Sequence, residues 1–410
     1  MRMDLTARQL AVLLASMVAL SPLAVDAYLP ALPTMATELG TTVNILQTSL
    51  STYLGGLGLG LLLGGPLSDH YGRRLVGKIG IFIFMVISLA IALIHHAEAI
   101  IVLRFVQAFG GGCLTVIAPA FVRDRYDGKE AARIFALIGL IMAVAPLLAP
   151  AIGAVILTYF GWEWIFVFLG AYALLILIVV MPRLPERRIK VLSAISPRQV
   201  FKDYWGVLTH KSAMGYLLTQ SFAIGVMFVF LTSSSYTYIE YFGVSEGMFP
   251  VYFGMNMVAA MLLNRLNPFL LKFLDPHQIL GIGLCSQFLT VVALAFLTLA
   301  GRAEFVFVVP LIVGSVGAAG LIMPNCMTCF ISNFPEKPGT ANALFGTSQY
   351  VIGGCLGALA SAFHTGNILP MSLMMLVGSV TALGAYTVLA GGRLRMPALQ
   401  RDGQADDSRQ

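Results

Sequence analysis

Charged residues are scarce in this sequence. Asp, Glu, Lys and Arg make up only 11% of the 410 residues, whereas 58% of the residues are hydrophobic. A soluble globular protein carries about 25% charged residues, so this chain has too few charges to cover a water-exposed surface of its size. Apolar runs of about 18 residues or more recur along the chain, and each is long enough to cross a bilayer as a helix. The sequence therefore excludes a soluble globular domain and predicts an all-α polytopic membrane protein.

The short motifs of common enzymes are also missing. No G-x-x-x-x-G-K-[ST], H-E-x-x-H or G-x-S-x-G stretch occurs, which leaves no P-loop to couple ATP hydrolysis and no recognisable hydrolase site. The five cysteines lie in apolar runs and are expected to pack as small hydrophobes. Cys326 and Cys329 have redox or metal spacing, but no His or carboxylate lies near them. We expect no enzymatic activity, no metal or cofactor, and no nucleic-acid partner.

Twelve apolar segments are long enough to be membrane spans, and they fall into two sets of six. The predicted spans cover residues 8–32, 43–66, 75–95, 98–121, 132–157, 162–181, 213–237, 247–270, 278–299, 304–330, 339–363 and 368–391. Two sets of similar length predict two pseudo-symmetric six-helix bundles, the arrangement of a duplicated transporter whose binding site lies near the bilayer midplane.

The connections between spans divide the chain and predict its orientation. Lys and Arg gather in the connections on one side, whereas Arg302 is the one basic residue of the connections on the other side. By the positive-inside rule both termini and the central connection are cytoplasmic. We predict an N-terminal bundle over residues 1–182, a cytoplasmic loop over 183–211, a C-terminal bundle over 212–392 and a disordered cytoplasmic tail over 393–410. Residues 198–205 fit either an amphipathic helix on lipid headgroups or a solvated linker.

One acid, Asp26, falls within a predicted span and away from the span ends. A charge there costs roughly 2.5–3.5 kcal/mol on insertion scales, so an intramembrane acid indicates a function. Arg104 is the matching base: with a rise of about 1.5 Å per residue, both residues fall at a similar depth in the outer half of the membrane. A direct ion pair and a water-linked pair both fit, as does a purely structural role in joining helices. We favour proton exchange driven by a gradient.

The connection between the second and third spans carries a longer motif. Gly65-Pro-Leu-Ser-Asp-His-Tyr-Gly-Arg-Arg74 resembles the G-x-L-x-D-x-x-G-R-[RK] signature of the major facilitator superfamily. The resemblance implies a charge network that holds the outward-open state of the transporter, completed by an acid at the cytoplasmic end of the fourth span. The residues implied in this conformational switch are Gly65, Asp69, Gly72, Arg73, Arg74 and Asp124.

Three further stretches resemble the drug–proton antiporters of that superfamily. Residues 104–108 are similar to R-x-x-Q-G of the fourth span, with Ala108 in place of glycine. Residues 145–153 are similar to the antiporter motif of the fifth span, including Pro146, Pro150 and Gly153, with Ala149 in place of glycine. Asp-Ala-Tyr-Leu-Pro-Ala-Leu-Pro at 26–33 resembles the bicyclomycin and chloramphenicol resistance group. That resemblance implies a monomer in the bacterial inner membrane that exports small organic drugs in exchange for protons.

A cavity that accepts many drugs needs adaptable apolar surface and a few polar groups. The chain has 19 methionines, whose flexible thioethers suit such a surface. The candidate cavity residues near the midplane are Tyr53, Met142, Phe222, Met227, Asn256, Met257, Asn325, Gln349 and Tyr350. Selective export of a natural metabolite, such as a nucleoside or a sugar, is the alternative function on the same scaffold.

Overall fold

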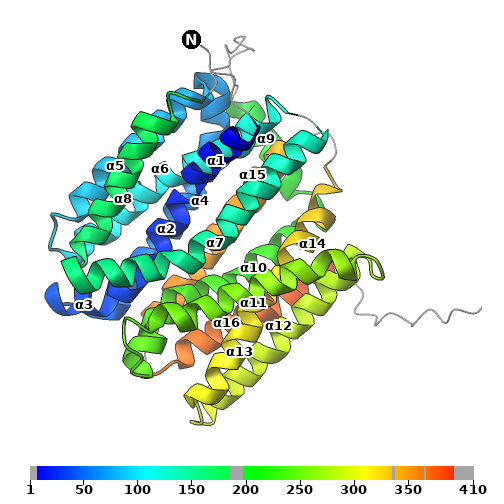
Figure 1. The fold of residues 1–410 in the computed structure, drawn as a ribbon. Helices are drawn as coiled ribbons and strands as arrows, with labels where there is room; N and C mark the ends of the chain where they lie inside the picture. The colour runs from blue at the N-terminus through cyan, green and yellow to red at the C-terminus, as the bar shows by residue number, and fades with distance from the viewer. Residues whose placement is uncertain (1–6, 127, 185–196, 335–337, 364–365, 392–410) are drawn as a thin grey trace, which may run out of the picture.

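The computed structural model describes residues 7–126, 128–184, 197–334, 338–363 and 366–391, and every regular element in these ranges is helical. Six spans form the first half of the chain (Figure 1). The first span is divided into α1 (Ala7–Val18), α2 (Leu20–Asp26), the 3₁₀ turn η1 (Leu29–Ala31) and α3 (Leu32–Glu38). The next five spans are α4 (Val43–Tyr71), α5 (Arg73–Ile91), α6 (Ala97–Arg123), α7 (Gly128–Phe160), and α8 (Glu163–Leu175) with its π-helical end η2 (Ile176–Val180).

Six more spans follow the short helix α9 (Pro197–Leu208). They are α10 (Lys211–Ser235) with η3 (Tyr236–Tyr241), α11 (Phe249–Leu270), α12 (Pro276–Leu299), α13 (Phe305–Gly317) with α14 (Ala319–Ile331), α15 (Pro338–Ala362), and α16 (Leu369–Gly384) with η4 (Ala385–Leu389). Eleven stretches of the described residues are apolar and long enough to cross a membrane, and α11, with 22 residues, packs beside them as the twelfth span. The predicted all-α fold of twelve spans is confirmed. The predicted boundary at 182/183 stays a prediction, and the tail over 393–410 lies outside the described residues.

Prolines explain why the first span is interrupted beside its acid. Proline lacks a backbone N–H and cannot continue the hydrogen-bond ladder of a helix. Pro30 therefore leaves the carbonyl of Asp26 without its helical partner, and Pro33 does the same for the carbonyl of Leu29. The backbone passes through η1 at this point before it resumes as α3. The span thus carries its carboxylate at the end of a helix segment.

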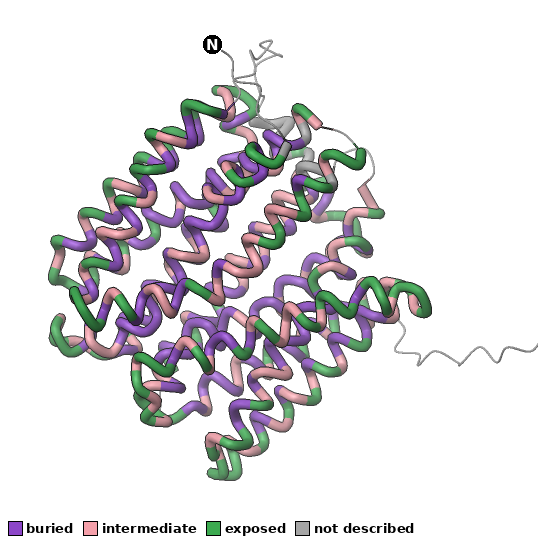
Figure 2. Tube along the Cα trace, viewed as in Figure 1, coloured by how far each residue is buried: buried purple, intermediate pink, exposed green. Residues whose placement is uncertain are grey.

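The two ends of the helical assembly differ in charge. One end, which we call the basic face, holds the α4–α5 turn with Arg73 and Arg74, and the α6–α7 connection with Arg125 and Lys129. The opposite end, the acidic face, holds Glu38, Glu163, Glu246 and Glu304. Buried side chains follow the inner faces of the helices, and exposed ones follow the outer faces (Figure 2). Many of the exposed side chains are large and apolar, as a lipid-facing surface requires.

Two helix pairs join the halves of the chain: α4 packs on α15, and α7 packs on α11. Along the first pair, the Thr347 hydroxyl donates to the Gly58 carbonyl at 3.2 Å, and the Ser361 hydroxyl donates to Gln47 Oε1 at 3.3 Å. At the acidic face, the Thr34 hydroxyl donates to Glu246 Oε1 at 2.7 Å. Two of these three hydrogen bonds, Ser361 to Gln47 and Thr34 to Glu246, therefore join the two six-span sets in the half of the molecule nearer the acidic face.

Candidate functional site: a buried carboxylate and a caged arginine

Asp26 is buried at the C-terminal end of α2, where only 3% of the residue is exposed. Its Oδ1 atom has no hydrogen-bond partner among the described residues. A buried polar atom without a partner is uncommon, since the lost hydration is normally replaced by protein hydrogen bonds. The carboxylate is therefore left uncompensated at this atom.

Arg104 on α6 is fully buried, and its contacts do not include Asp26. Its Nη1 donates to Gln107 Oε1 at 2.8 Å, and its Nη2 donates to the Ala24 carbonyl at 3.0 Å. Gln107 in turn donates from Nε2 to Ser88 Oγ on α5 at 2.7 Å. The guanidinium thus links α6 to α2 directly and to α5 through one amide.

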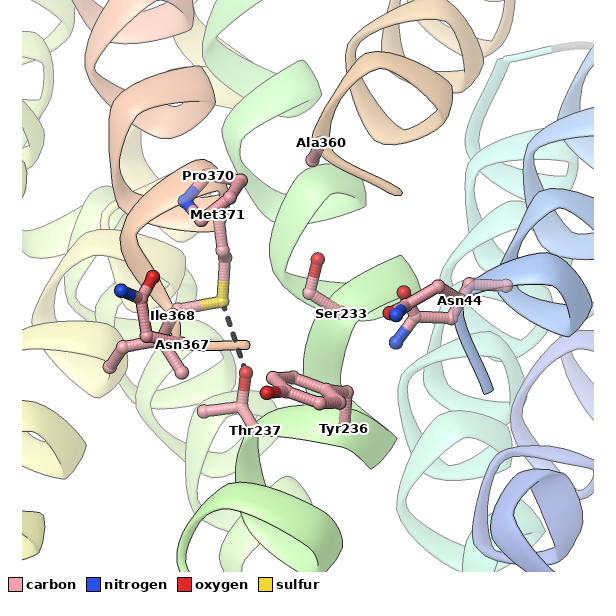
Figure 3. A pocket seen from close by; sticks show the side chains of 10 residues that line it. Asn44, Ser233, Tyr236, Thr237, Ala360, Asn367, Ile368, Pro370 and Met371 are labelled. Atoms are coloured by element: carbon pink, nitrogen blue, oxygen red, sulfur yellow. Dashed lines mark hydrogen bonds between the residues drawn. The ribbon is translucent and has the colours of Figure 1, made fainter. Parts of the chain in front are cut away.

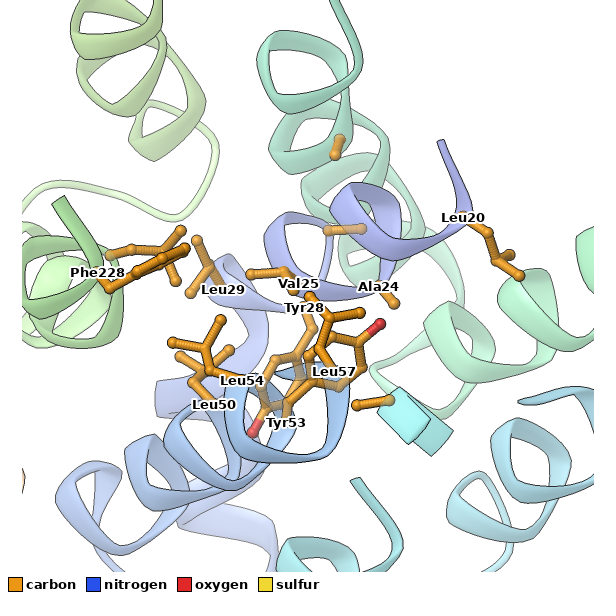
Figure 4. Packing of buried hydrophobic residues seen from close by; sticks show 14 of the residues in the cluster. Leu20, Ala24, Val25, Tyr28, Leu29, Leu50, Tyr53, Leu54, Leu57 and Phe228 are labelled. Carbon is orange, nitrogen blue, oxygen red and sulfur yellow. The ribbon is translucent and has the colours of Figure 1, made fainter. Parts of the chain in front are cut away.

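Three aromatic rings enclose the same guanidinium. Its Cζ lies 4.3 Å from the ring centre of Tyr53, 4.8 Å from that of Tyr28 and 5.8 Å from that of Phe166. Figure 4 shows the Tyr28 and Tyr53 side chains together, one from the first span and one from α4. A cation over an aromatic face gains about 0.5–2 kcal/mol, with the larger values in desolvated sites. The cage therefore stabilises a buried cation without an opposing carboxylate.

The direct Asp26–Arg104 ion pair that the sequence left open is absent among the described residues. Both side chains are buried, and each belongs to a helix next to the other, since α2 packs on α6. The Tyr53 hydroxyl is buried and has no hydrogen-bond partner within the described part of the chain, and its ring lies over Arg104. The site thus combines a caged cation, an unpartnered carboxylate and an unpartnered phenol.

The stretch 145–153 on α7 packs against the turn that carries Asp26. Gly153 lies against the backbone of Ala27, so closely that a Cβ at this position would overlap the Ala27 carbonyl. Pro146 and Pro150 lie inside α7 and remove two of its backbone hydrogen bonds. Only glycine permits this approach of α7 to the α2–η1 connection, so Gly153 fixes the position of the residue next to Asp26.

The charged residues of the α4–α5 turn meet at the basic face. Arg73 donates from Nε to Asp124 Oδ2 at 2.8 Å and from Nη2 to Asp124 Oδ1 at 3.1 Å, and its Nη2 lies 3.5 Å from Asp69 Oδ1. Gly72 separates α4 from α5 with a φ of 98°, a conformation that favours glycine. The network therefore joins the ends of α4, α5 and α6.

Arg74 and Gly65 belong to the same motif but are not part of this charged network. Arg74 donates from Nη2 to the Pro182 carbonyl at 3.3 Å, which connects the turn to the end of the sixth span. Gly65 lies inside α4, where a Cβ would make ordinary contact with Val116. Close packing therefore does not account for glycine at position 65.

Three of the candidate cavity residues are near the junction of the halves. Tyr53 on α4 is fully buried, while Tyr350 on α15 packs on Phe228 with ring centres 5.4 Å apart and ring planes tilted by 40°. Gln349 accepts a hydrogen bond from Gln220 Nε2 at 3.3 Å, so it links α15 to α10. The α4–α15 pairing brings Tyr53 and the 349–350 pair to the same helix interface.

The amides among the remaining cavity candidates form hydrogen bonds within the second half. The other candidates are apolar side chains that pack against the core. Asn325 donates to Asn267 Oδ1 and to the Leu321 carbonyl, both at 2.7 Å, so its amide joins α14 to α11. Asn256 donates to carbonyls of its own helix, while its Oδ1 has no described partner. The half-buried apolar candidates that pack against the core are Met142, Phe222, Met227 and Met257.

Three important residues were not assigned roles from sequence: Gln107, Tyr28 and Phe166. A signal existed for the first two. Gln107 follows Arg104 by three residues, which places both on one helix face, and Tyr28 follows Asp26 by two residues. Nothing local marks Phe166, because it reaches the guanidinium only through the packing of α8 on α5 and α2. Among the described residues, no group of three or more His, Cys, Asp or Glu side chains is arranged to hold a metal ion.

Comparison with known proteins gives one consistent result. The family model of the Major Facilitator Superfamily matches residues 14–358. The chain is 30% identical over 384 residues to a bicyclomycin resistance protein homolog of Haemophilus influenzae, with 92% of this chain and 94% of that protein covered. It is also 30% identical over 346 residues to a chloramphenicol resistance protein of Pseudomonas aeruginosa, with 83% and 80% covered. The crystal structure of a D-xylose–proton symporter, at 15% identity, has the same fold with a TM-score of 0.70 and covers 91% of this chain and 96% of that one.

Proposed function

The chain belongs to the Major Facilitator Superfamily, within its bicyclomycin and chloramphenicol resistance group, and we propose that it exports small organic drugs in exchange for protons. It is a multi-pass membrane protein and a transporter, not an enzyme. The proposed cargo is chloramphenicol-like or bicyclomycin-like, in line with the names of the relatives. The proposed setting is the bacterial inner membrane, with a monomer in contact with lipid and with the basic face toward the cytoplasm, where the positive-inside rule puts Lys and Arg.

The observation that carries the proposal is the unpartnered oxygen of Asp26 inside a membrane span. An ionised carboxylate in such a site lacks the hydrogen bonds and the counter-ion that would replace its hydration. Binding a proton removes the charge and with it this cost. The nearby cation donates from Nη1 to Gln107 and from Nη2 to the Ala24 carbonyl, and three rings enclose it, while its Nε has no partner among the described residues. Because it forms no described ion pair with Asp26, it does not hold Asp26 permanently ionised.

Coupling requires that the site open to one side of the membrane at a time. The α4–α15 and α7–α11 contacts are the interfaces along which the two halves would rock. The Asp26 turn rests on α7 through Gly153, and Tyr53 on α4 rests on Arg104. A change at the α7–α11 interface therefore reaches the residue after Asp26, and a change at the α4–α15 interface reaches the Ala24 carbonyl through Tyr53 and Arg104. This contact supports alternating access in which the exposure of Asp26 changes with the relative position of the halves.

The network of Asp69, Arg73 and Asp124 is the proposed conformational switch at the basic face. It ties together the ends of α4, α5 and α6, so these helices move as one unit during the change. The proposed drug cavity lies between the halves and uses Tyr53 and Tyr350 for apolar contact. The amide of Gln349 and the half-buried methionines Met142, Met227 and Met257 complete the proposed lining.

The test uses the purified protein in liposomes that hold chloramphenicol, with an imposed pH gradient. The native chain is expected to move drug uphill and to carry protons the opposite way. In Asp26→Asn, uphill movement of drug is expected to fall to the level of liposomes without protein. The variant is still expected to exchange labelled for unlabelled drug when the drug concentrations on the two sides are equal. The matched control is Glu98→Gln, which removes an exposed acid at the start of α6 and leaves both activities intact. Proton-driven accumulation by Asp26→Asn would refute the proton-carrier role.

A further inference from the structure

A small polar hollow lies between the two halves (Figure 3), and neither Asp26 nor Arg104 is among the described residues that line it. It lies toward the acidic face, because its lining includes Asn44 in the first turn of α4. Its lining includes Asn44 and Gln47 from α4 in the first half, and residues of α10, η3, α15 and the start of α16 in the second. The hydrogen-bonding side chains that line it are Asn44, Gln47, Ser233, Tyr236, Thr237 and Asn367. None of the sequence motifs described above includes these residues.

The chemistry of the hollow is neutral and hydrogen-bonding. Among the described residues that line it, none carries a carboxylate, amine, guanidinium or imidazole. Three amides and three hydroxyls face apolar surface from Met371 and Ile368, and the Thr237 hydroxyl donates to Met371 Sδ at 3.4 Å. Glu240 follows Tyr236 along η3, but it is not among the lining residues.

One lining group is buried without the partner that it needs. Gln47 is only 2% exposed, and its Oε1 accepts a hydrogen bond from Ser361. Its Nε2 has no partner among the described residues. A buried amide N–H that is left unsatisfied costs about 1–3 kcal/mol, and an acceptor that entered the hollow would recover part of that cost.

The hollow is too small for a drug in this conformation. Its cavity volume is about 10 Å³, far below the roughly 300–1,000 Å³ typical of small-molecule sites. Because its walls come from both halves, a movement that separates α4 from α10 and α16 would enlarge it. That movement is the one that alternating access requires for opening at the acidic face.

We propose that this hollow is the collapsed form of a second cargo site, a release site that binds neutral molecules bearing hydroxyl and amide groups when the acidic face opens. This inference rests on the proposed export function and adds a location and a chemical class to it. Cargo enters the site after leaving the neighbourhood of Asp26. The amides of Asn44 and Gln47 bind its polar groups, and Met371 packs on its apolar part.

The experiment places a cysteine in the hollow. Ser233→Cys, in intact cells, is treated from outside with a membrane-impermeant maleimide, and labelling is measured above that of the native chain. The matched reporter is Thr34→Cys, which lies opposite Glu246 at the acidic face and outside the hollow. Both cysteines respond to opening of this face, but only the first is covered by cargo in the proposed site.

Chloramphenicol is expected to slow labelling of Ser233→Cys while labelling of Thr34→Cys is unchanged. Tetraphenylphosphonium, a cation without hydrogen-bonding groups, is expected to protect neither. Adding Gln47→Leu to Ser233→Cys removes one neutral hydrogen bond, so about fivefold more chloramphenicol is needed for the same protection. Thr158→Val is the control for this addition, because that exposed hydroxyl bonds only within α7, and it leaves the protection unchanged.

Three results would overturn the inference. Equal slowing at both cysteines would mean that chloramphenicol only shifts the conformational equilibrium. Equal protection by tetraphenylphosphonium would remove the neutral specificity, and absence of labelling or of protection at Ser233→Cys would remove the site. These readouts do not use a proton gradient, so they are separate from failure of the proposed function, which the liposome assay detects in the native chain.

Discussion

At the scale of single residues, Arg104 shows how a buried cation is stabilised without an acid beside it. Two hydrogen bonds from a charged donor contribute about 1.5–3 kcal/mol each, and the rings of Tyr28, Tyr53 and Phe166 add cation–π attraction. Lysine has one compact charge and lacks the planar fork that reaches two acceptors while it stacks on rings. Arginine is therefore required by geometry as well as by charge.

The first prediction concerns the independence of Asp26 and Arg104. Arg104→Lys is expected to lower the free energy of unfolding by about 1–3 kcal/mol, because it loses a directed hydrogen bond and ring stacking. Asp26→Asn is expected to leave stability unchanged or to raise it, since it removes an uncompensated charge. In the double variant the effects add to within about 0.5 kcal/mol, as measured by denaturant titration in detergent. A coupling well above that value would instead indicate an ion pair in the folded protein.

Sequence reasoning identified Asp26 and Arg104 because a charge within an apolar run is visible without any structure. Sequence reasoning could not decide whether the two side chains form an ion pair, because Arg104 is enclosed by a cage of rings that the sequence does not reveal. The three rings come from the first, second and sixth spans, and no local pattern indicates that they converge on one guanidinium. The role of Asn325 could not be predicted for the same reason. Its amide donates to Asn267, which lies on another helix.

At the scale of helices, the contact between α7 and the α2–η1 connection ties the antiporter-like stretch to the acid. The second prediction is that Gly153→Ala abolishes proton-coupled transport, since its Cβ would overlap the Ala27 carbonyl and push the Asp26 turn away from α7. The change is expected to cost about 1–3 kcal/mol of stability, as overpacking does. Gly139→Ala, on the same helix with open space around it, is the control. Drug-dependent proton flux in liposomes measures both, and native flux in Gly153→Ala would contradict the prediction.

The third prediction concerns the charged network at the basic face. Asp124→Asn weakens both contacts with Arg73, and we expect it to slow turnover severalfold while the drug concentration for half-maximal rate stays the same. The reason is that the network joins helix ends rather than cargo-facing groups. The loss of stability is expected to be about 1–2 kcal/mol, because the two side chains are largely buried.

Arg125→Gln is the control for this change, because it removes a neighbouring exposed charge. Transport rates measured over a range of drug concentrations distinguish slower turnover from weaker cargo binding. A higher half-maximal concentration with unchanged turnover in Asp124→Asn would assign Asp124 to cargo binding instead.

The positions of the helices were the most predictable feature. Predicted spans such as 43–66 and 278–299 correspond to α4 and α12 with ends shifted by a few residues, because long apolar runs define a membrane helix. Pro30 and Pro33 predict that the helix of the first span is interrupted, but they do not predict that the interruption is a 3₁₀ turn. The extension of α4 to Tyr71 was missed because its last turn is polar.

At the scale of the whole molecule, the α4–α15 interface determines how closely the halves approach each other. Gly354 lies against α4, and a Cβ there would lie 3.0 Å from the Ser51 carbonyl oxygen and 3.3 Å from Leu54 Cβ. The fourth prediction is that Gly354→Val forces the halves apart near the acidic face. Labelling of Thr34→Cys from outside is then expected to be about fivefold faster than in the native background, equivalent to about 1 kcal/mol in the conformational equilibrium.

The control for the fourth prediction is Gly346→Val on the same helix, where a Cβ meets nothing within 4 Å. It is expected to leave the labelling rate unchanged. Equal rates in the two glycine variants would mean that this interface does not limit opening at the acidic face.

The helix α4 is a wall of every site described above. Its Tyr53 covers Arg104, its Asn44 and Gln47 line the hollow, its Gly58 accepts a bond from α15, and Asp69 is part of the charged network. For inhibition of the proposed export, this means that a compound that fills the opened hollow would keep α4 apart from the second half and stop the cycle. Because the hollow lies toward the acidic face, the proposed outer side, such a compound would not need to cross the membrane to act.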